Sequence, residues 1–105
     1  MKSYIQIITT TEKRKDAEKI ADVLVNEKLA ACVQIVGPIT SIYWWKGHVE
    51  KAEEWQCLIK TRQDLYEEIE KTIKSLHPYD VPEMIALPLS KVSKDYLLWL
   101  DSVLI

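Results

Sequence analysis

The segment Leu76-His77-Pro78-Tyr79-Asp80-Val81-Pro82-Glu83 separates a helical pattern before it from a strand pattern after it. Each of its two prolines fixes its own φ and disfavours a helical conformation in the preceding residue. The loop is therefore stiff, and it presents an imidazole, a phenol and two carboxylates in defined directions. Binding groups concentrate on loops that a rigid scaffold holds. The segment either carries part of a functional site or acts only as a rigid helix-to-strand connector.

The patterns on either side of this loop predict a helix, a strand and a second helix. Before the loop, a helix should end at Leu76, with Thr61 and Asp64 forming a near capping box at its start. The apolar face of this helix consists of Leu65, Ile69, Ile73 and Leu76. After the loop, residues 84–89 predict a short strand, and Ser93 is placed to cap a last helix that is apolar nearly all round.

The N-terminal half predicts a strand, a helix and a long hairpin. Residues 3–10 are rich in β-formers, and residues 12–28 have helical apolar spacing. The hairpin arms span roughly 30–45 and 49–61, with an interruption at Gly37-Pro38 and a turn at Lys46-Gly47. The order is β-α-β-β-α-β plus a C-terminal helix. This order predicts one α+β domain over residues 1–105, with a ferredoxin-like sheet and two helices on one face.

Composition excludes several classes of protein. The chain has 105 residues, of which 48% are apolar and 29% charged, and its net charge of −2 argues against binding to nucleic acid. No apolar run approaches the ~18–20 residues that span a bilayer, so we expect no membrane association. The N-terminus lacks the layout of a signal peptide. Two cysteines, Cys32 and Cys57, lie far apart in the sequence, and we expect a reduced, cytoplasmic protein without a disulfide framework.

Two features predict a homo-oligomer. The hairpin arms are longer than typical strands of about five or six residues, so the hairpin should overhang the sheet and expose aromatic edges. The last helix is apolar nearly all round, which is typical of a helix buried on more than one side. Four tryptophans, a heavy load for this length, also suit subunit interfaces: Trp44, Trp45, Trp55 and Trp99. A monomer with an exposed, twisted ribbon is the alternative.

Five segments together resemble the CutA1 family, the divalent-cation tolerance proteins. They are Leu29-Ala30-Ala31-Cys32-Val33, Ser41-Ile42-Tyr43-Trp44-Trp45-Lys46-Gly47, 54–61, His77-Pro78-Tyr79-Asp80-Val81-Pro82-Glu83 and Tyr96-Leu97-Leu98-Trp99. The resemblance covers nearly the whole chain. It implies a homotrimer of ferredoxin-like subunits whose long hairpins pair between subunits, with an overall shape similar to the PII signalling proteins. It also implies a role in tolerance to divalent cations, copper above all.

The resemblance places candidate metal ligands at Cys32 and His77, and Glu83 would complete a weak site. Thiolate and imidazole suit copper or zinc, but the chain lacks the closely spaced ligands of a closed zinc site. Thr9 and Leu76 replace a cysteine and a histidine found in some relatives, so we expect weak copper binding in clefts between subunits and no obligatory cofactor. A lone strand cysteine is often only a small core residue.

The residues that match the family and are expected to line the intersubunit cleft are Lys60, Tyr79, Glu83 and Trp45. They leave open a second function, a PII-like signalling or scaffold trimer whose cleft binds a small metabolite or anion. A third, a cysteine hydrolase, requires Cys32 and His77 to meet as a thiolate–imidazole pair. We expect a divalent-cation tolerance protein that is not an enzyme, with divalent metal ions and further copies of itself as partners.

Overall fold

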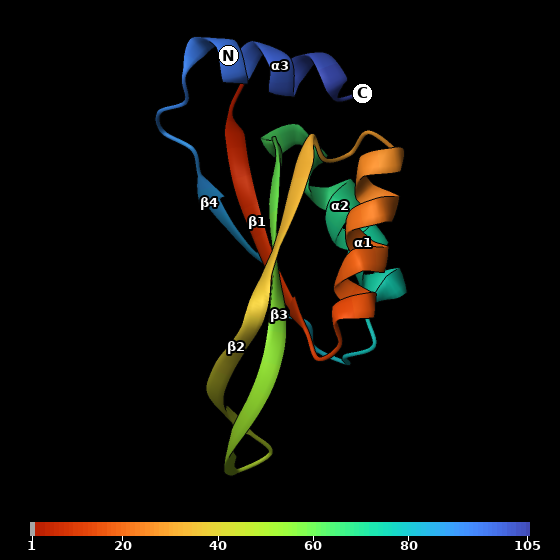
Figure 1. The fold of residues 1–105 in the computed structure, drawn as a ribbon, viewed down its shortest axis with the longest axis vertical. Helices are drawn as coiled ribbons and strands as arrows, with labels where there is room; N and C mark the ends of the chain where they lie inside the picture. The colour runs from red at the N-terminus through yellow and green to blue at the C-terminus, as the bar shows by residue number, and fades with distance from the viewer. Residues whose placement is uncertain (1) are drawn as a thin grey trace.

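The computed structural model describes residues 2–105 and confirms the α+β, ferredoxin-like fold (Figure 1). Its elements are β1 (Tyr4–Thr11), α1 (Arg14–Asn26), β2 (Cys32–Trp45), β3 (His48–Arg62), a 3-10 turn (Gln63–Leu65), α2 (Tyr66–Leu76), β4 (Ile85–Pro88) and α3 (Lys94–Val103). The sheet has four strands in the order β2-β3-β1-β4, and every neighbouring pair is antiparallel. No described helix is long and apolar enough to cross a membrane.

The hydrophobic core lies between the sheet and the pair of helices α1 and α2, which cover one face (Figure 1). Ile7 of β1 and its partner Ile59 of β3 are fully buried at its centre. The helices contribute side chains at the predicted spacing, namely Ala17, Ile20 and Leu24 from α1 and Ile69 and Ile73 from α2. Because side chains alternate along each strand, residues next to these core positions point to the opposite face, on which neither α1 nor α2 packs.

The hairpin of β2 and β3 is as long as predicted and extends well beyond the rest of the sheet (Figure 1). Its strands have 14 and 15 residues, and the chain measures 44 × 25 × 22 Å as a result. The expected interruption at Gly37-Pro38 is a bulge between Val36 and Ile39 within one continuous strand. The turn at Lys46 and Gly47 has positive φ at both residues, as a tight hairpin turn requires.

The predicted capping box at Thr61 is wrong. Thr61 is still extended in β3, on the core face of the sheet, and its hydroxyl donates a hydrogen bond of 2.6 Å to the carbonyl of Leu29. The helix begins only after the 3-10 turn, and Asp64 pairs with Arg62 at 2.7 Å instead. Ser93 stands at the predicted N-cap of α3, but its side chain makes no capping hydrogen bond.

Helix α3 lies across one end of the sheet and is held there by polar contacts (Figure 1). Asp101 accepts hydrogen bonds from Lys2, Tyr4 and Arg62 at 2.9, 3.0 and 3.2 Å. Leu100 is its one fully buried residue. Within one subunit the helix is therefore not buried on more than one side, and apolar surface remains uncovered on Tyr96, Leu98 and Trp99.

Candidate functional site

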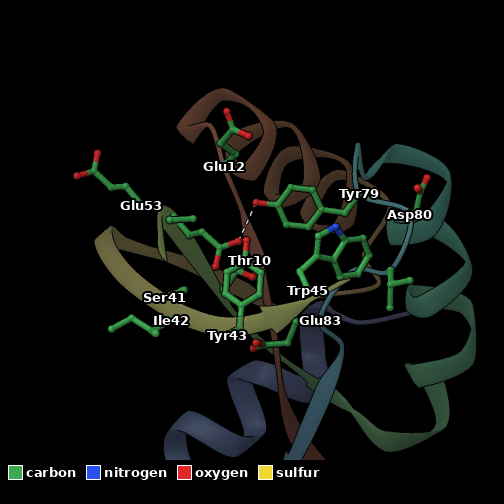
Figure 2. A pocket seen from close by; sticks show the side chains of 13 residues that line it. Thr10, Glu12, Ser41, Ile42, Tyr43, Trp45, Glu53, Tyr79, Asp80 and Glu83 are labelled. Atoms are coloured by element: carbon green, nitrogen blue, oxygen red, sulfur yellow. Dashed lines mark hydrogen bonds between the residues drawn. The ribbon is translucent and has the colours of Figure 1, made fainter. Parts of the chain in front are cut away.

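A groove of about 980 Å³ lies between the hairpin and the proline-containing loop (Figure 2). Thr10 and Glu12 contribute from the end of β1 and the residue that follows it, and both arms of the hairpin form one side. The loop after α2 supplies the opposite side through Tyr79, Asp80 and Glu83. The stiff loop singled out from the sequence therefore forms one wall of a cavity and is more than a connector.

Tyr79 and Glu54 join the two walls of the groove. The Tyr79 hydroxyl donates a hydrogen bond of 2.7 Å to Oε2 of Glu54, drawn as a dashed line in Figure 2. Glu54 is only 5% exposed although it is charged. Burial raises the pKa of Tyr79 far above its usual value, and the hydrogen bond and charge of Glu54 raise it further. Tyr79 therefore stays a neutral hydrogen-bond donor at physiological pH.

His77 holds the loop in place through both of its ring nitrogens. Nε2 lies 2.7 Å from the carbonyl oxygen of Thr10, and Nδ1 accepts a hydrogen bond of 3.1 Å from the backbone N–H of Tyr79. This pairing requires the tautomer with its proton on Nε2. The ring is buried and packs against the Tyr79 ring at 4.7 Å between centroids. Coordination of a metal by His77 would therefore require one of these two hydrogen bonds to break.

Negative charge dominates the groove. Five carboxylates line it: Glu12, Glu53, Glu54, Asp80 and Glu83. Lys, Arg and His are absent from the described residues that line it. Glu83 is exposed as a residue, yet local desolvation raises the pKa of its carboxyl, and the charge of Glu54 raises it further. The potential inside the groove therefore favours cations and repels anions.

Cys32 and Lys60 lie away from this groove within the subunit. They face each other across β2 and β3, next to the core-facing pair of the partly buried Val33 and the buried Ile59, and so point to the face opposite α1 and α2. Lys60 also pairs with Gln6, four positions before Thr10 on β1, a separation of about 13 Å along an extended strand. Lys60 donates a hydrogen bond to Gln34. Of the predicted cleft residues, Trp45, Tyr79 and Glu83 come together in one subunit and Lys60 does not.

The predicted metal ligands do not meet within one subunit. Cys32 is half-buried at the start of β2, whereas His77 is tied to Thr10 toward the other end of β1. Among residues 2–105, no group of three potential ligands from Cys, His, Asp and Glu gathers closely enough to hold a metal ion. A thiolate–imidazole pair of Cys32 and His77 likewise does not form within a subunit. A copper site that draws on neighbouring subunits stays a prediction.

Cys57 is a core residue. It is fully buried, its Sγ lies 3.7 Å from the carbonyl oxygen of Ala17, and burial raises the pKa of its thiol to about 11. A thiol that is buried and protonated at neutral pH is a poor metal ligand and nucleophile. Cys32 is therefore the more available of the two thiols.

Sequence reasoning missed Glu54, the most buried carboxylate of the groove. Nothing in the local pattern distinguishes Glu54 from the neighbouring Glu53, because both precede a strand core of alternating residues. Its burial arises from the loop that folds over the hairpin and brings Tyr79 to it. A contact of this kind, between residues 25 positions apart, has no signal in single-sequence periodicity.

Known proteins match nearly the whole chain. The family model described as CutA1 divalent ion tolerance protein matches residues 5–103. The divalent-cation tolerance protein CutA of Pyrococcus horikoshii is 42% identical over 96 residues, covering 91% of this chain and 93% of that protein. Its counterpart in Thermus thermophilus is 43% identical over 94 residues, covering 90% of this chain and 91% of that protein.

Solved structures give the same result. The crystal structure of CutA1 from Oryza sativa superposes with a TM-score of 0.95 at 39% identity, covering 98% of this chain and 94% of that one. The divalent cation tolerance protein from Thermus thermophilus superposes with a TM-score of 0.94 at 39% identity, covering 97% and 99% of the two chains. Sequence and structure therefore agree that the chain belongs to the CutA1 family of divalent ion tolerance proteins.

Proposed function

We propose that this chain acts as a cytoplasmic homotrimer in divalent-cation tolerance, binding copper weakly where subunits meet and catalysing no reaction. The observation that carries the copper proposal is the environment of Cys32. Its thiol is half-buried on the face of the sheet opposite α1 and α2, whereas Cys57 is sealed in the core. A partly accessible thiolate is the soft ligand that copper prefers.

Uncovered apolar surface supports the homotrimer. It lies on the overhanging hairpin and on α3, with Trp44 74% and Leu98 61% exposed. Contiguous apolar surface on a subunit marks an interface when polar residues rim it. The free edges of the long hairpin also invite pairing with another chain. Assembly of this kind would place residues of two subunits beside the sheet face that carries Cys32.

The ligand set explains why copper binding should be weak. Cys32 supplies one soft ligand, and the exposed Glu83 can supply an oxygen. His77 joins only at the expense of its hydrogen bond to Tyr79 or to Thr10. Copper would therefore have to collect ligands from more than one subunit, and rearranging the loop would cost binding free energy. The proposal accordingly includes no obligatory cofactor.

Native mass spectrometry of the reduced protein with limiting copper tests this function. We expect a trimer that takes up a fixed number of copper ions, a count that falls in Cys32→Ala and vanishes in Cys32→Ala/His77→Ala. Cys57→Ala is the matched control, because it removes a thiol that solvent does not reach. A monomer at micromolar concentration, or graded uptake that is equal in all variants, would contradict the proposal.

The second candidate function is a PII-like signalling or scaffold trimer that binds a metabolite. The observation that favours it is the groove itself, which combines a rigid loop with the aromatic rings of Tyr43, Trp45 and Tyr79. Because Lys60 lies elsewhere in the subunit and the lining is acidic, the ligand should not be an anion. A thermal-shift screen in which copper protects through a saturable site, while metabolites have no effect, would count against this candidate.

A further inference from the structure

Among the described residues, the Glu54 carboxylate in the groove has no cationic partner. The residue is only 5% exposed, and the one hydrogen-bond donor to its carboxylate in the described chain is the neutral hydroxyl of Tyr79. None of the ion pairs in residues 2–105 involves Glu54 or the other four groove carboxylates. Burying a carboxylate without a cation costs free energy, which a cation entering the groove would recover.

Aromatic rings also line the groove around this charge. Tyr43, Trp45 and Tyr79 line the groove together with the carboxylates (Figure 2). The faces of such rings attract cations, most strongly when the cation is partly desolvated. The chain already shows this chemistry at Trp45, where Nζ of Lys46 lies 5.7 Å from the ring centroid. A ring wall beside a buried carboxylate is complementary to an organic cation.

A bare divalent metal ion suits this groove less well than an organic cation. Hard divalent ions need several oxygen ligands converging within about 2.6 Å, and no such group of three gathers in the described chain. The carboxylates are instead spread around a groove of about 980 Å³, which lies in the range of small-molecule sites. Negative charges spread over that space are complementary to a flexible small molecule that carries several separated positive charges.

We propose that the groove binds a linear polyamine, with one ammonium group held between Glu54 and the rings of Trp45 and Tyr79. The remaining ammonium groups lie against the outer carboxylates Glu12, Glu53, Asp80 and Glu83. This inference does not depend on copper binding, because Glu54, the carboxylate that carries it, is not among the proposed copper ligands. The inference rests on the second candidate function, the PII-like trimer, and names its class of ligand. It does not require the copper binding of the first candidate function.

Isothermal titration calorimetry of the full-length protein with spermidine, in buffer containing EDTA, tests the proposal. We expect saturable binding that weakens at least tenfold in Glu54→Gln, a change that keeps an acceptor for the Tyr79 hydroxyl. Trp45→Leu should weaken binding several-fold. Glu50→Gln is the matched control, because it removes the same charge from β3 outside the groove and should leave the affinity within twofold. Octane-1,8-diol, a flexible chain without charge, should not bind.

The ammonium could also come from a lysine of a second copy of this chain, and the experiment separates the two sources. If Glu54→Gln weakens the assembly in native mass spectrometry and spermidine does not bind the wild type, the ammonium comes from a neighbouring subunit and the polyamine proposal is overturned. If spermidine binds wild type and Glu54→Gln equally, or if it does not bind and the assembly of Glu54→Gln is intact, the proposal is overturned. Thermal melts of each variant confirm that it is folded.

Discussion

His77 and Tyr79 turn the proline-containing loop into a fixed wall. His77 links the carbonyl of Thr10 to the backbone of Tyr79, and the Tyr79 hydroxyl continues the chain of hydrogen bonds to Glu54. Connected polar groups of this kind hold one geometry because loss of any member leaves buried partners unsatisfied. Two segments that are far apart in the sequence are thereby held at a defined separation across the groove.

At the residue scale, Gly37 is a test of packing in the hairpin. A Cβ at this position would lie 2.5 Å from a ring carbon of Trp55 and 3.2 Å from the carbonyl oxygen of Glu54. Gly37→Ala should therefore destabilise the protein by about 1–3 kcal/mol, the usual cost of overpacking, measured as a lower urea midpoint. In a Trp55→Leu background the added cost should largely disappear. A Gly37→Ala cost that is the same in both backgrounds would mean that the Trp55 ring is not its cause.

Glu83 gives the groove a predictable dependence on pH. Desolvation first and the charge of Glu54 second raise the folded-state pKa of Glu83 above its unfolded value. The protonated carboxyl is then favoured in the folded state, so the contribution is fully present below the unfolded pKa and is lost as pH rises through the folded pKa. Glu83→Gln should accordingly be more stable than wild type at pH 7, by a small margin because the residue is exposed.

The margin between Glu83→Gln and wild type should close as the pH falls below about 4, where both side chains are neutral. Urea unfolding at several pH values measures it. Glu50→Gln, at the far end of the hairpin, controls for the change in net charge. A margin for Glu83→Gln that is independent of pH would contradict the assignment of the effect to this carboxyl.

The sequence identified the chemistry of the loop but not its partners. His77, Tyr79 and Glu83 stood out because a stiff loop concentrates polar groups, and the structure places all three at the groove or directly behind it. Glu54 and the carbonyl of Thr10 were not predicted, because each acquires its role through a contact with the loop. Lys60 was grouped with Tyr79 by family resemblance, and strand register places it opposite Gln6, about 13 Å along β1 from Thr10 of the groove.

At the scale of elements, hydrophobic periodicity predicted the two core helices and the hairpin. The residues that cap the helix ends were predicted poorly. The buried positions of α1 and α2 are those with helical spacing. Thr61 failed as a cap because its strand continues to Arg62 and a buried carbonyl of Leu29 competes for its hydroxyl. Caps depend on where tertiary contacts end an element, which a local pattern does not contain.

The C-terminus of α1 offers a test of this element-scale reasoning. Lys28 follows the helix with φ of +60°, and its backbone N–H donates to the carbonyl of Val25. A left-handed conformation costs a non-glycine residue about 1–2 kcal/mol, and glycine avoids this cost. Glycine also loses more conformational entropy on folding, which offsets roughly 0.5–1 kcal/mol of the stabilisation. Lys28→Gly should therefore stabilise the protein by about 0.5–1 kcal/mol in urea unfolding.

Lys19→Gly is the matched control for Lys28→Gly. It makes the same substitution at an exposed position inside α1, where glycine should destabilise by about 1 kcal/mol. Opposite signs at the two positions would show that backbone conformation, and not the loss of a lysine charge, determines the effect. Two changes of the same sign would contradict the role of the left-handed residue.

At the scale of the whole molecule, the subunit has one covered and one uncovered side. Helices α1 and α2 cover one face of the sheet (Figure 1). The hairpin and α3 carry exposed rings and aliphatic side chains. The same uncovered face carries Cys32 at one end and borders the acidic groove at the other. Assembly, metal binding and ligand binding would therefore be coupled through this face, so its contacts between copies decide which groups remain accessible.

Trp44 near the hairpin tip is the residue at which the role of the hairpin in assembly can be tested. It is 74% exposed, so its replacement should change the stability of an isolated subunit little. If the hairpin pairs between copies, Trp44→Glu places a charge in an apolar interface and should raise the dissociation constant of the assembly at least tenfold, measured by sedimentation equilibrium. Val25→Glu on the outer surface of α1 adds the same charge to another exposed apolar residue and should leave the assembly intact. An unchanged dissociation constant in Trp44→Glu would exclude this part of the hairpin from any interface between copies and leave α3 as the remaining uncovered surface.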